Sequence, residues 1–356
     1  MKRLIAIIFI ICTSVSFAQI PPGYYDSAAG LQGSALKTAL FNIIKNPNVD
    51  SYSELWSDFY STDKDNYYEH DGTVLDIYSE NPNGTDPYNF TLGSDQCGTY
   101  STEGDCYNRE HSFPKSWFNN ATPMYSDLFH LYPTDGKVNG QRSNYPYGEV
   151  SNPSWTSLNG SKLGPCSYPG YTGTVFEPID EFKGDLARTY FYMATCYEDR
   201  IETWSSVVLN GTSYPCYTSW FINMLLQWNT QDPVSQKEID RNNAVYNIQG
   251  NRNPYIDHPE WVNCIWANDC SSDISAPTIT YLKISPNPVK NIVSVSSSEK
   301  INTCYIINTT GQIVYSKNNI SDNKTRINLS FLKAGFYFIT VRDEKGNNTV
   351  SKIIKN

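Results

Sequence analysis

The sequence of 356 residues has few histidines and lacks the patterns of a membrane protein or of a structural zinc protein. Only four histidines are present, and no Cys-x-x-Cys pair occurs among the nine cysteines, so a structural zinc site is not expected. Beyond the N-terminal segment, no stretch has the length and hydropathy of a transmembrane helix. Basic residues are also scarce, and the formal net charge is −9. These absences argue against an integral membrane protein and against a tight nucleic-acid-binding module.

The charge is unevenly distributed along the chain. Residues 278–356 hold 11 basic and 4 acidic residues, a balance of +7, whereas residues 19–277 hold 14 basic and 32 acidic residues, a balance of −18. A domain with this negative charge repels a polyanion. An enzyme that holds nucleic acid weakly, through a cation and a few local arginine or lysine side chains, can nevertheless function with such a charge.

The N-terminus has the pattern of a secretory signal peptide. Lys2 and Arg3 precede an apolar run, and the small residues in the segment 14–18 suit cleavage after residue 18. The apolar run is too short to span a bilayer comfortably, so we expect no stable membrane anchor. The mature protein is therefore predicted to be exported through the periplasm and to be secreted or located at the cell surface.

The cysteines suit an exported protein, in which disulfides are permitted. Cys97 with Cys106, and Cys264 with Cys270, lie close in sequence and are the first pairs to test. Sequence alone does not determine the pairing. Seven cysteines lie between residues 19 and 277, and this odd number predicts at least one free thiol.

The mature chain divides into domains of different composition. Residues 19–270 combine helical patterns with long polar loops, which predicts an α+β fold, and residues 271–277 form a linker. Residues 278–356 carry short β-branched runs between turns, which predicts a small all-β sandwich of about seven strands. In the first domain we expect strands at 73–78 and 107–113, paired as a hairpin, and helices at 34–45, 51–60, 135–144, 181–198, 220–228 and 233–248.

Local signals refine some of these elements. Ser51 followed by Glu54 predicts a capping box for the helix at 51–60. Thr134 or Asp135 is expected to cap the helix that follows. The spacing of apolar residues in the helix at 181–198 is amphipathic, and residues 150–180 are expected to be loop.

Residues 106–150 contain the side chains that a metal-dependent phosphodiesterase needs. Glu110 and Asn139 offer hard oxygen ligands suited to Mg²⁺ or Ca²⁺. His111 titrates near neutrality and is able to accept a proton from water. Arg142 lies one turn beyond Asn139 on the same helix face and is expected to brace a phosphate oxygen. Phosphodiester hydrolysis requires these three contributions.

Each of these residues also has a structural interpretation. A Glu-His dipeptide is uninformative by itself, and an asparagine on a helix is usually solvated. Glu110 and His111 would point to opposite faces of an ideal strand, so a shared site requires the strand to bend or end there. His130 is interpreted either as a half-buried histidine bonded to the backbone or as a positioning residue of the site.

Two longer stretches, NREHSFPKSW and DLFHLYPTDGKVNGQRSNYP, resemble the endonuclease I family of secreted and periplasmic nucleases, which belongs to the His-Me finger (ββα-metal) group. PPGYYDSAAG and NRNPYIDHPEWV extend the resemblance over nearly all of residues 19–270. The resemblance implies a His-Me finger core embedded in helices and long loops. It also implies a sequence-nonspecific endonuclease that cuts DNA and often RNA with one divalent cation and leaves 5′-phosphate ends. We expect a monomer.

The resemblance assigns roles by position in the motif. His111 becomes the general base, Glu110 and Asn139 become the metal ligands, and Arg142 takes a phosphate-binding or structural role. Mg²⁺ is the expected cation, with Ca²⁺ or Mn²⁺ as alternatives. His130 is a further candidate for the catalytic site. The candidates for substrate contact besides Arg142 are Arg109 and Lys115.

One residue departs from the family pattern. Phe129 stands where many relatives have a second histidine. Because His130 and Asn139 are retained, we expect activity to be retained.

The C-terminal segments ISPNPVKN, GQIVYS, LKAGFYFITV and KIIKN resemble the sorting domains of the type IX secretion system of Bacteroidetes. The resemblance implies that the secretion machinery is a partner and that this domain directs the protein across the outer membrane. The alternative is a β-sandwich appendage that binds surface glycans or acts as a spacer.

Two other functions compete with the nuclease interpretation. One is an exported phosphodiesterase that acts on small or lipid phosphates. The other is a non-catalytic binding or adhesion protein, in which the β-sandwich and surface tyrosines would be the functional parts.

Overall fold

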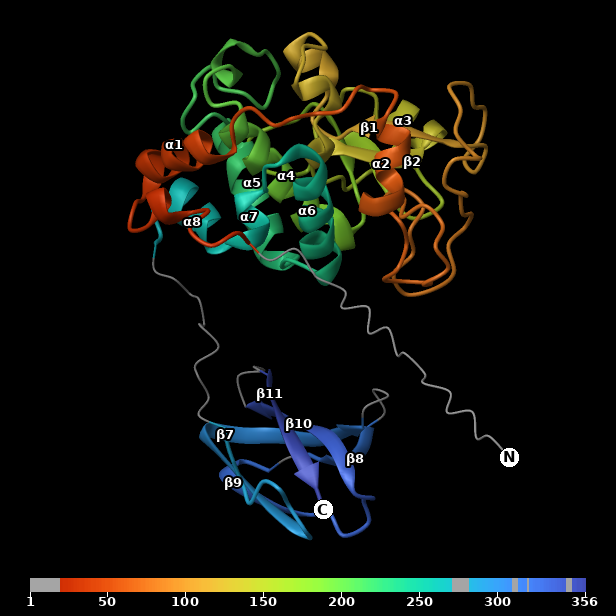
Figure 1. The fold of residues 1–356 in the computed structure, drawn as a ribbon. Helices are drawn as coiled ribbons and strands as arrows, with labels where there is room; N and C mark the ends of the chain where they lie inside the picture. Colours follow the sequence, from red (N-terminus) through yellow and green to blue (C-terminus); the bar gives the residue numbers. More distant parts are fainter. Residues whose placement is uncertain (1–19, 271–281, 309–312, 319, 344–347) are drawn as a thin grey trace, which may run out of the picture. The chain divides into compact units, whose positions relative to one another are not determined.

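The computed structural model describes residues 20–270, 282–308, 313–318, 320–343 and 348–356. The chain separates into two compact units, Met1–Cys270 and Ser271–Asn356 (Figure 1). The predicted signal peptide at 1–18 and the predicted linker at 271–277 lie outside the described residues. Within the described ranges, no helix has the length and apolar character needed to cross a membrane.

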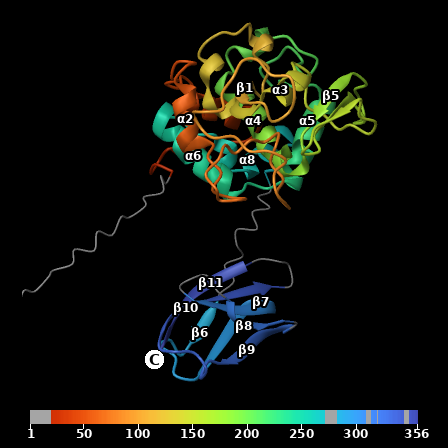
Figure 2. The ribbon, with the colours of Figure 1, turned by 90° about the vertical axis from the view of Figure 1, so that its right-hand side faces the viewer.

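The first unit is organised around the helix α4 (Lys183–Cys196), all of whose residues are buried. It packs against α1 (Gly33–Ile44), α5 (Ser219–Gln231) and α7 (Pro254–Asp257), and Figures 1 and 2 show it among the other helices. The helix predicted at 181–198 is confirmed, and its polar residues are buried as well as its apolar ones. Neighbouring elements cover both its apolar and its polar faces.

The polar residues of α4 are buried because they have partners on other elements. Arg188 forms an ion pair of 2.6 Å with Glu238, and Lys183 lies 2.8 Å from Glu177. Charged side chains are rarely buried unless they are paired in this way. Long-range pairing of this kind cannot be read from an amphipathic pattern.

The helix predicted at 51–60 has different bounds in the structure. The helix expected at 51–60 begins at Leu55. The Ser51 hydroxyl bonds the Ser53 hydroxyl instead of a backbone N–H, although the Ser51 N–H does donate to Glu54 at 2.9 Å. This helix is α2 (Leu55–Thr62), and further α-helices of the first unit are α3 (Gly136–Arg142), α6 (Gln236–Gln249) and α8 (Glu260–Trp266). Short 3-10 helices lie at Asp26–Ala28, Lys115–Phe118, Met124–Ser126, Leu128–His130, Asp180–Phe182 and Ile201–Thr203.

Two short antiparallel strands lead directly into α3. The strand β1 (Tyr107–His111) pairs with β2 (Leu131–Asp135), so that Glu110 lies opposite Tyr132, and α3 begins at the next residue. Helix α3 packs against both strands. The β1–β2–α3 unit therefore brings the end of β1 next to α3.

The hairpin expected between 73–78 and 107–113 is wrong. Residues 73–78 form a bridge and a turn, in which the buried Asp76 accepts a hydrogen bond of 2.8 Å from the Tyr78 N–H. A carboxylate that bonds the backbone two residues further on favours a turn over an extended strand. Strand β2 pairs with β1 instead.

A second small sheet lies in the region expected to be loop. The strands β3 (Trp155–Thr156), β4 (Lys162–Pro165) and β5 (Thr174–Glu177) pair in the order β3–β4–β5. Strands of two to four residues are too short to show an alternating pattern in the sequence.

The second unit is all-β with antiparallel pairing, as predicted. Its long strand β7 pairs with β6 and β9 through its first half and with β8 and β10 through its second half. Its core consists of aliphatic side chains such as Val293, Ile306 and Ile339. About seven strands were expected, and six occur in the described part of this unit: β6 (Lys283–Ser285), β7 (Ile292–Asn308), β8 (Ile313–Lys317), β9 (Asp322–Asn328), β10 (Gly335–Asp343) and β11 (Asn348–Lys355).

A first prediction concerns the cap of α3. The Asp135 carboxylate accepts hydrogen bonds from the Val138 N–H at 2.7 Å and from the Gly104 N–H at 2.8 Å. We expect Asp135→Ala to lower the free energy of unfolding by about 2 kcal/mol, and Asp135→Asn to lower it less because the amide keeps one acceptor. All eight tryptophans lie before residue 271, so urea unfolding followed by tryptophan fluorescence reports on the first unit. Equal stability of Asp135→Ala and the wild type would contradict this role.

Candidate active site

A cavity of about 510 Å³ opens beside the end of β1 and the second half of α3. Its wall includes five of the residues proposed from the sequence, namely Arg109, Glu110, His111, Lys115 and Asn139. The other two, His130 and Arg142, do not line it. Strand β1 ends at His111, which allows Glu110 and His111 to face one cavity although they alternate along the strand.

His111 is held by backbone and aromatic contacts. Its Nε2 lies 3.1 Å from the carbonyl oxygen of Tyr125, and its ring stacks on Tyr52 at a centroid distance of 5.7 Å. A carbonyl oxygen only accepts hydrogen bonds, so Nε2 carries the proton and Nδ1 is left as the acceptor. Burial, together with the nearby His130, lowers the pKa of His111 well below its usual value. The imidazole is therefore neutral at pH 7 and able to accept a proton.

Glu110 is a buried carboxylate with fixed orientation. Its side chain is 2 % exposed, and Oε1 accepts hydrogen bonds from the Tyr78 hydroxyl at 2.9 Å and from Arg142 at 2.8 Å. Burial raises the pKa of Glu110, and the positive charge of Arg142 opposes this rise. Glu110 also lines the cavity, and its Oε1 is already hydrogen-bonded to Tyr78 and Arg142.

Arg142 lies behind the cavity and joins α3 to the end of β1. Its guanidinium donates to Glu110, to the His111 carbonyl at 2.7 Å and to the Ser112 carbonyl. The residue is only 1 % exposed, so the expected contact with a substrate phosphate does not fit its position. The alternative, a structural role, agrees with these contacts, which hold Glu110 and the backbone of His111.

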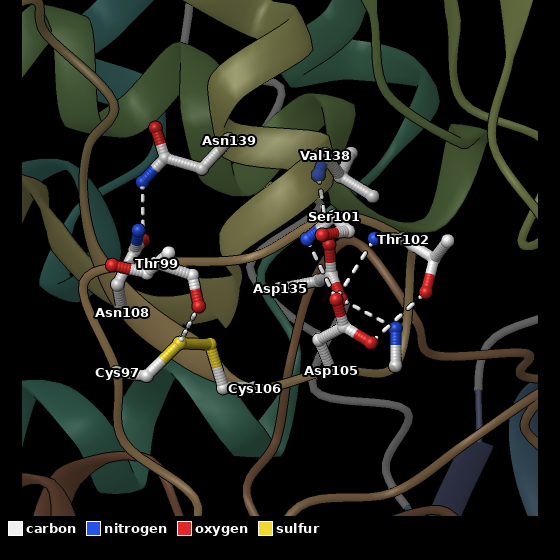
Figure 3. Close-up of a disulfide and its surroundings, with 11 residues drawn as sticks. Cys97, Thr99, Ser101, Thr102, Asp105, Cys106, Asn108, Asp135, Val138 and Asn139 are labelled. Carbon is white, nitrogen blue, oxygen red and sulfur yellow. Dashed lines mark hydrogen bonds between the residues drawn. A yellow bond between two sulfur atoms is a disulfide. The ribbon is translucent and has the colours of Figure 1, made fainter.

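Asn139 and Asn108 form a pair of amides on the cavity wall. Asn139 Nδ2 donates to Asn108 Oδ1 at 2.6 Å (Figure 3), which leaves the Asn139 Oδ1 oxygen for another partner. Sequence reasoning missed Asn108. The signal was its position two residues before Glu110, because residues at i and i+2 share a face of a strand.

The pair of amides lies next to a disulfide and a helix cap. Figure 3 shows the disulfide between Cys97 and Cys106 just before β1, and the Asp135 cap bonded to the Val138 N–H at the start of α3. This disulfide and the one between Cys264 and Cys270 confirm both predicted pairs. Cysteines 166, 196, 216 and 304 are free, which agrees with the expected free thiol.

Two cationic side chains lie at the cavity. The Arg109 guanidinium stacks on the rings of Tyr52 and Trp56, at 3.6 Å and 4.2 Å from their centroids. The exposed Lys115 lies 5.4 Å from the ring centroid of Tyr125. Both are placed to meet an anion that enters the cavity. Neither Tyr52 nor Trp56 carried a signal in the sequence that linked it to this site.

His130 lies behind His111. It is fully buried, its Nε2–H donates to the Met124 carbonyl at 2.6 Å, and its ring centroid lies 5.5 Å from that of His111. These contacts make it a buried histidine that packs against the residue facing the cavity. It was expected to be half-buried, and the structure buries it completely.

The donor set of the cavity fits a hard divalent cation. The Glu110 carboxylate and the amides of Asn139 and Asn108 supply oxygen atoms, which Mg²⁺ and Ca²⁺ prefer. Asn139 Oδ1 is oriented by the hydrogen bond that its own amide nitrogen donates. Glu110 Oε1 is already held by two donors, which fixes the carboxylate before any cation arrives.

Comparison with known proteins matches the sequence family described as Endonuclease I to residues 32–260. The chain belongs to the Endonuclease I family. Members of this family generally depend on a divalent metal ion. A second description, secretion system C-terminal sorting domain, matches residues 283–356.

Relatives of this Endonuclease I protein are nucleases by name, and several of the names specify an extracellular or periplasmic protein. An extracellular ribonuclease of Bacillus amyloliquefaciens is 36 % identical over 251 residues, which is 68 % of this chain and 78 % of the relative. An extracellular ribonuclease of Bacillus subtilis (strain 168) is 35 % identical over 250 residues, with the same two shares. Endonuclease-1 of Buchnera aphidicola subsp. Baizongia pistaciae is 31 % identical over 138 residues, 38 % of this chain and 48 % of that protein.

These matches confirm the prediction of an exported nuclease. The family and the sorting domain account for both halves of the chain. They favour the nuclease interpretation over a phosphodiesterase for small phosphates and over an adhesion protein.

A second prediction concerns His130 and pH. Burial lowers the pKa of His130 below its usual value, so the unfolded chain binds a proton there that the folded chain does not. The free energy of unfolding should therefore fall as pH decreases from about 6.5, by up to about 1.4 kcal/mol per pH unit for this group. His130→Gln should lose this part of the pH dependence in urea unfolding at pH 5.5–7.5. An identical pH dependence in both proteins would contradict it, because loss of His130 also removes one cause of the lowered pKa of His111.

Proposed function

We propose that this Endonuclease I protein is a sequence-nonspecific endonuclease that hydrolyses DNA and RNA with one divalent cation and leaves 5′-phosphate ends. We also propose that β1, β2 and α3 form a His-Me finger core. The observation that carries the proposal is the cavity at which the end of β1, with Glu110 and His111, meets Asn139 of α3. Two antiparallel strands followed directly by a helix support the ββα assignment.

His111 is the general base of the proposed reaction. Its Nε2–H is held by the Tyr125 carbonyl, which leaves Nδ1 to accept a proton from the attacking water. The lowered pKa keeps the imidazole in the neutral form that this role requires. His130 supports the ring from behind and is proposed as a positioning residue.

Glu110 and Asn139 are proposed to hold the cation, with Asn108 orienting the Asn139 amide. Mg²⁺ is the proposed ion, and Ca²⁺ or Mn²⁺ are alternatives with the same preference for oxygen ligands. When bound, a cation at this position supplies positive charge to the phosphate and to the leaving oxygen. Arg142 orients Glu110 from the protein side and is not proposed to touch substrate.

Arg109 and Lys115 are proposed to contact the phosphate backbone. They are the cationic side chains on the wall of the cavity, in a domain whose overall charge is negative. Two such contacts with phosphate groups give weak, salt-dependent binding of nucleic acid. Weak binding suits an enzyme that must release cleaved polymer and needs no sequence preference.

The substrate range rests on the relatives. The two Bacillus proteins that cover two thirds of this chain are named ribonucleases, and shorter matches are named deoxyribonucleases or Endonuclease-1. We therefore propose both DNA and RNA as substrates.

For the whole chain we propose a signal peptide at 1–18, a nuclease domain at 19–270, a linker at 271–277 and a sorting domain at 278–356. The match to a secretion sorting domain supports the last assignment. We propose the type IX system as the machinery that reads it and a monomer as the active form.

A third prediction tests the base. His111→Ala should lower the rate of plasmid and RNA cleavage by about 10²–10⁴-fold, because general-base assistance is lost. The assay is the conversion of supercoiled plasmid to nicked and linear forms, with Mg²⁺ and with EDTA. The matched control is His70→Ala, which changes an exposed histidine outside the cavity. A fully active His111→Ala protein would remove His111 from the mechanism.

A fourth prediction tests the cation ligands. Asn139→Ala should raise the Mg²⁺ concentration for half-maximal cleavage by about 10–100-fold, and Asn108→Ala should raise it less because it acts through Asn139. The control is Asn144→Ala, an exposed asparagine at the edge of the same cavity. Superimposable Mg²⁺ titrations for Asn139→Ala and the wild type would exclude Asn139 as a ligand.

A further inference from the structure

A second group of oxygen ligands lies in the long loop between α2 and β1, which Figure 1 draws in orange after α2. Carboxylate oxygens of Asp65, Glu69 and Glu80 all lie within 4.8 Å of one another. None of these residues lines the cavity beside His111. Among the described residues, it is the one group of three or more acidic, histidine or cysteine side chains whose ligand atoms lie close enough together to hold a metal ion.

Two oxygens of this cluster are buried without partners. Asp65 is 2 % exposed and Glu80 is 1 % exposed. Glu80 Oε1 and Glu69 Oε2 are buried and have no hydrogen-bond partner. Buried polar atoms of native proteins are almost always paired, and an unpaired carboxylate is especially costly. Two orphaned carboxylate oxygens in one cluster therefore indicate a missing positive partner.

The protein itself does not supply that partner. Among the described residues, no ion pair joins Asp65, Glu69 or Glu80 to a lysine or arginine. The charges that act on Glu80 are those of further carboxylates, including Asp86 and Asp76. The cluster is therefore a concentration of like charge, unlike Glu110, which has Arg142.

One carboxylate of the cluster is already fixed by the backbone. Asp65 Oδ1 accepts hydrogen bonds from the N–H groups of Tyr67 at 2.9 Å and Tyr68 at 3.1 Å, and Oδ2 accepts from the Glu69 N–H at 3.1 Å. These bonds hold Asp65 in place and leave lone pairs on both oxygens. A rigid first ligand reduces the conformational entropy that cation binding would otherwise cost.

The kind of ligand favours Ca²⁺ over Mg²⁺. Mg²⁺ demands near-ideal octahedral geometry and usually keeps several waters with only one or two carboxylates, whereas Ca²⁺ accepts several carboxylates at about 2.3–2.6 Å in flexible geometry. Three carboxylate oxygens within 4.8 Å of one another are close enough to share one Ca²⁺ ion. Irregular loop backbone also suits the flexible coordination of Ca²⁺.

We propose that Asp65, Glu69 and Glu80 bind one Ca²⁺ ion, separate from the cation of the proposed active site, and that this ion stabilises the loop between α2 and β1. Such a site suits an exported protein. Extracellular modules typically bind Ca²⁺ with dissociation constants of about 10⁻⁴–10⁻³ M. Glu80 lies two residues beyond Tyr78, whose hydroxyl donates to Glu110. The ion thus fixes the turn that supports the proposed catalytic carboxylate.

The test measures stability and bound ions, not nuclease activity. The full chain is stripped with EDTA, and its melting temperature is followed by tryptophan fluorescence as CaCl₂ or MgCl₂ is added. At about 100 times the dissociation constant, Ca²⁺ should raise the melting temperature by about 5–10 °C. Asn139→Ala should keep this shift, and native mass spectrometry should still count one bound Ca²⁺ in that variant.

The variants of the cluster should behave differently. Glu80→Gln and Glu69→Gln should lose the Ca²⁺ shift, and the exposed control Glu202→Gln should keep it. In EDTA, Glu80→Gln should melt no lower than the wild type, because it removes a repelling charge, so the order of stability reverses when Ca²⁺ is added. If Glu80→Gln does not fold, the half-buried Glu69→Gln carries the same comparison.

Several outcomes would overturn the proposal. A wild type whose melting temperature responds to pH but not to Ca²⁺ would mean that a shared proton, not a metal ion, joins Glu69 and Glu80. A Ca²⁺ shift that disappears in Asn139→Ala, or persists in both glutamine variants, would assign the ion elsewhere. An inactive nuclease would leave this result unchanged, so failure of the proposed function and failure of the Ca²⁺ site are distinguishable.

Discussion

The buried ion pair between Arg142 and Glu110 is the interaction on which the arrangement of the site depends. Each side chain is almost fully buried, and either charge alone would be strongly destabilising there. Arg142 also bonds the carbonyls of His111 and Ser112, so it ties the end of β1 to the end of α3. This connection places His111 and Asn139 on one cavity although 28 residues of sequence separate them.

The two acidic sites of the first unit differ in how their charge is compensated. Glu110 has an internal cation and a tyrosine hydroxyl, so its carboxylate keeps one orientation without help from solvent. Glu69 and Glu80 have buried oxygens and no such partner among the described residues. The first arrangement is preformed for chemistry, and the second depends on an ion from outside. An exported protein meets Ca²⁺ in its surroundings, which makes that dependence tolerable.

The nuclease unit is acidic overall, but cationic side chains lie at its cavity. A net charge of −18 over residues 19–277 opposes a polyanionic substrate at long range, but screening limits that repulsion at physiological salt. At short range, Arg109 and Lys115 lie on the cavity wall. Arg109 is held in place by stacking on Tyr52 and Trp56. In the proposed mechanism, these two cations at the cavity meet the substrate despite the negative charge of the unit.

The sequence by itself determined the family and the export, because the motif around Glu110 and His111 and the segments of the sorting domain are each contiguous in the chain. It also suggested the two disulfide pairs through their short spacing. It also predicted the helices whose apolar spacing is regular. Only the tertiary structure decided that β2, not residues 73–78, pairs with β1, that Asn108 bonds Asn139 on the cavity wall, and that Arg142 is buried against Glu110. Each of these depends on contacts between residues far apart in the chain, and local propensity and spacing contain no information about which distant group will become the neighbour.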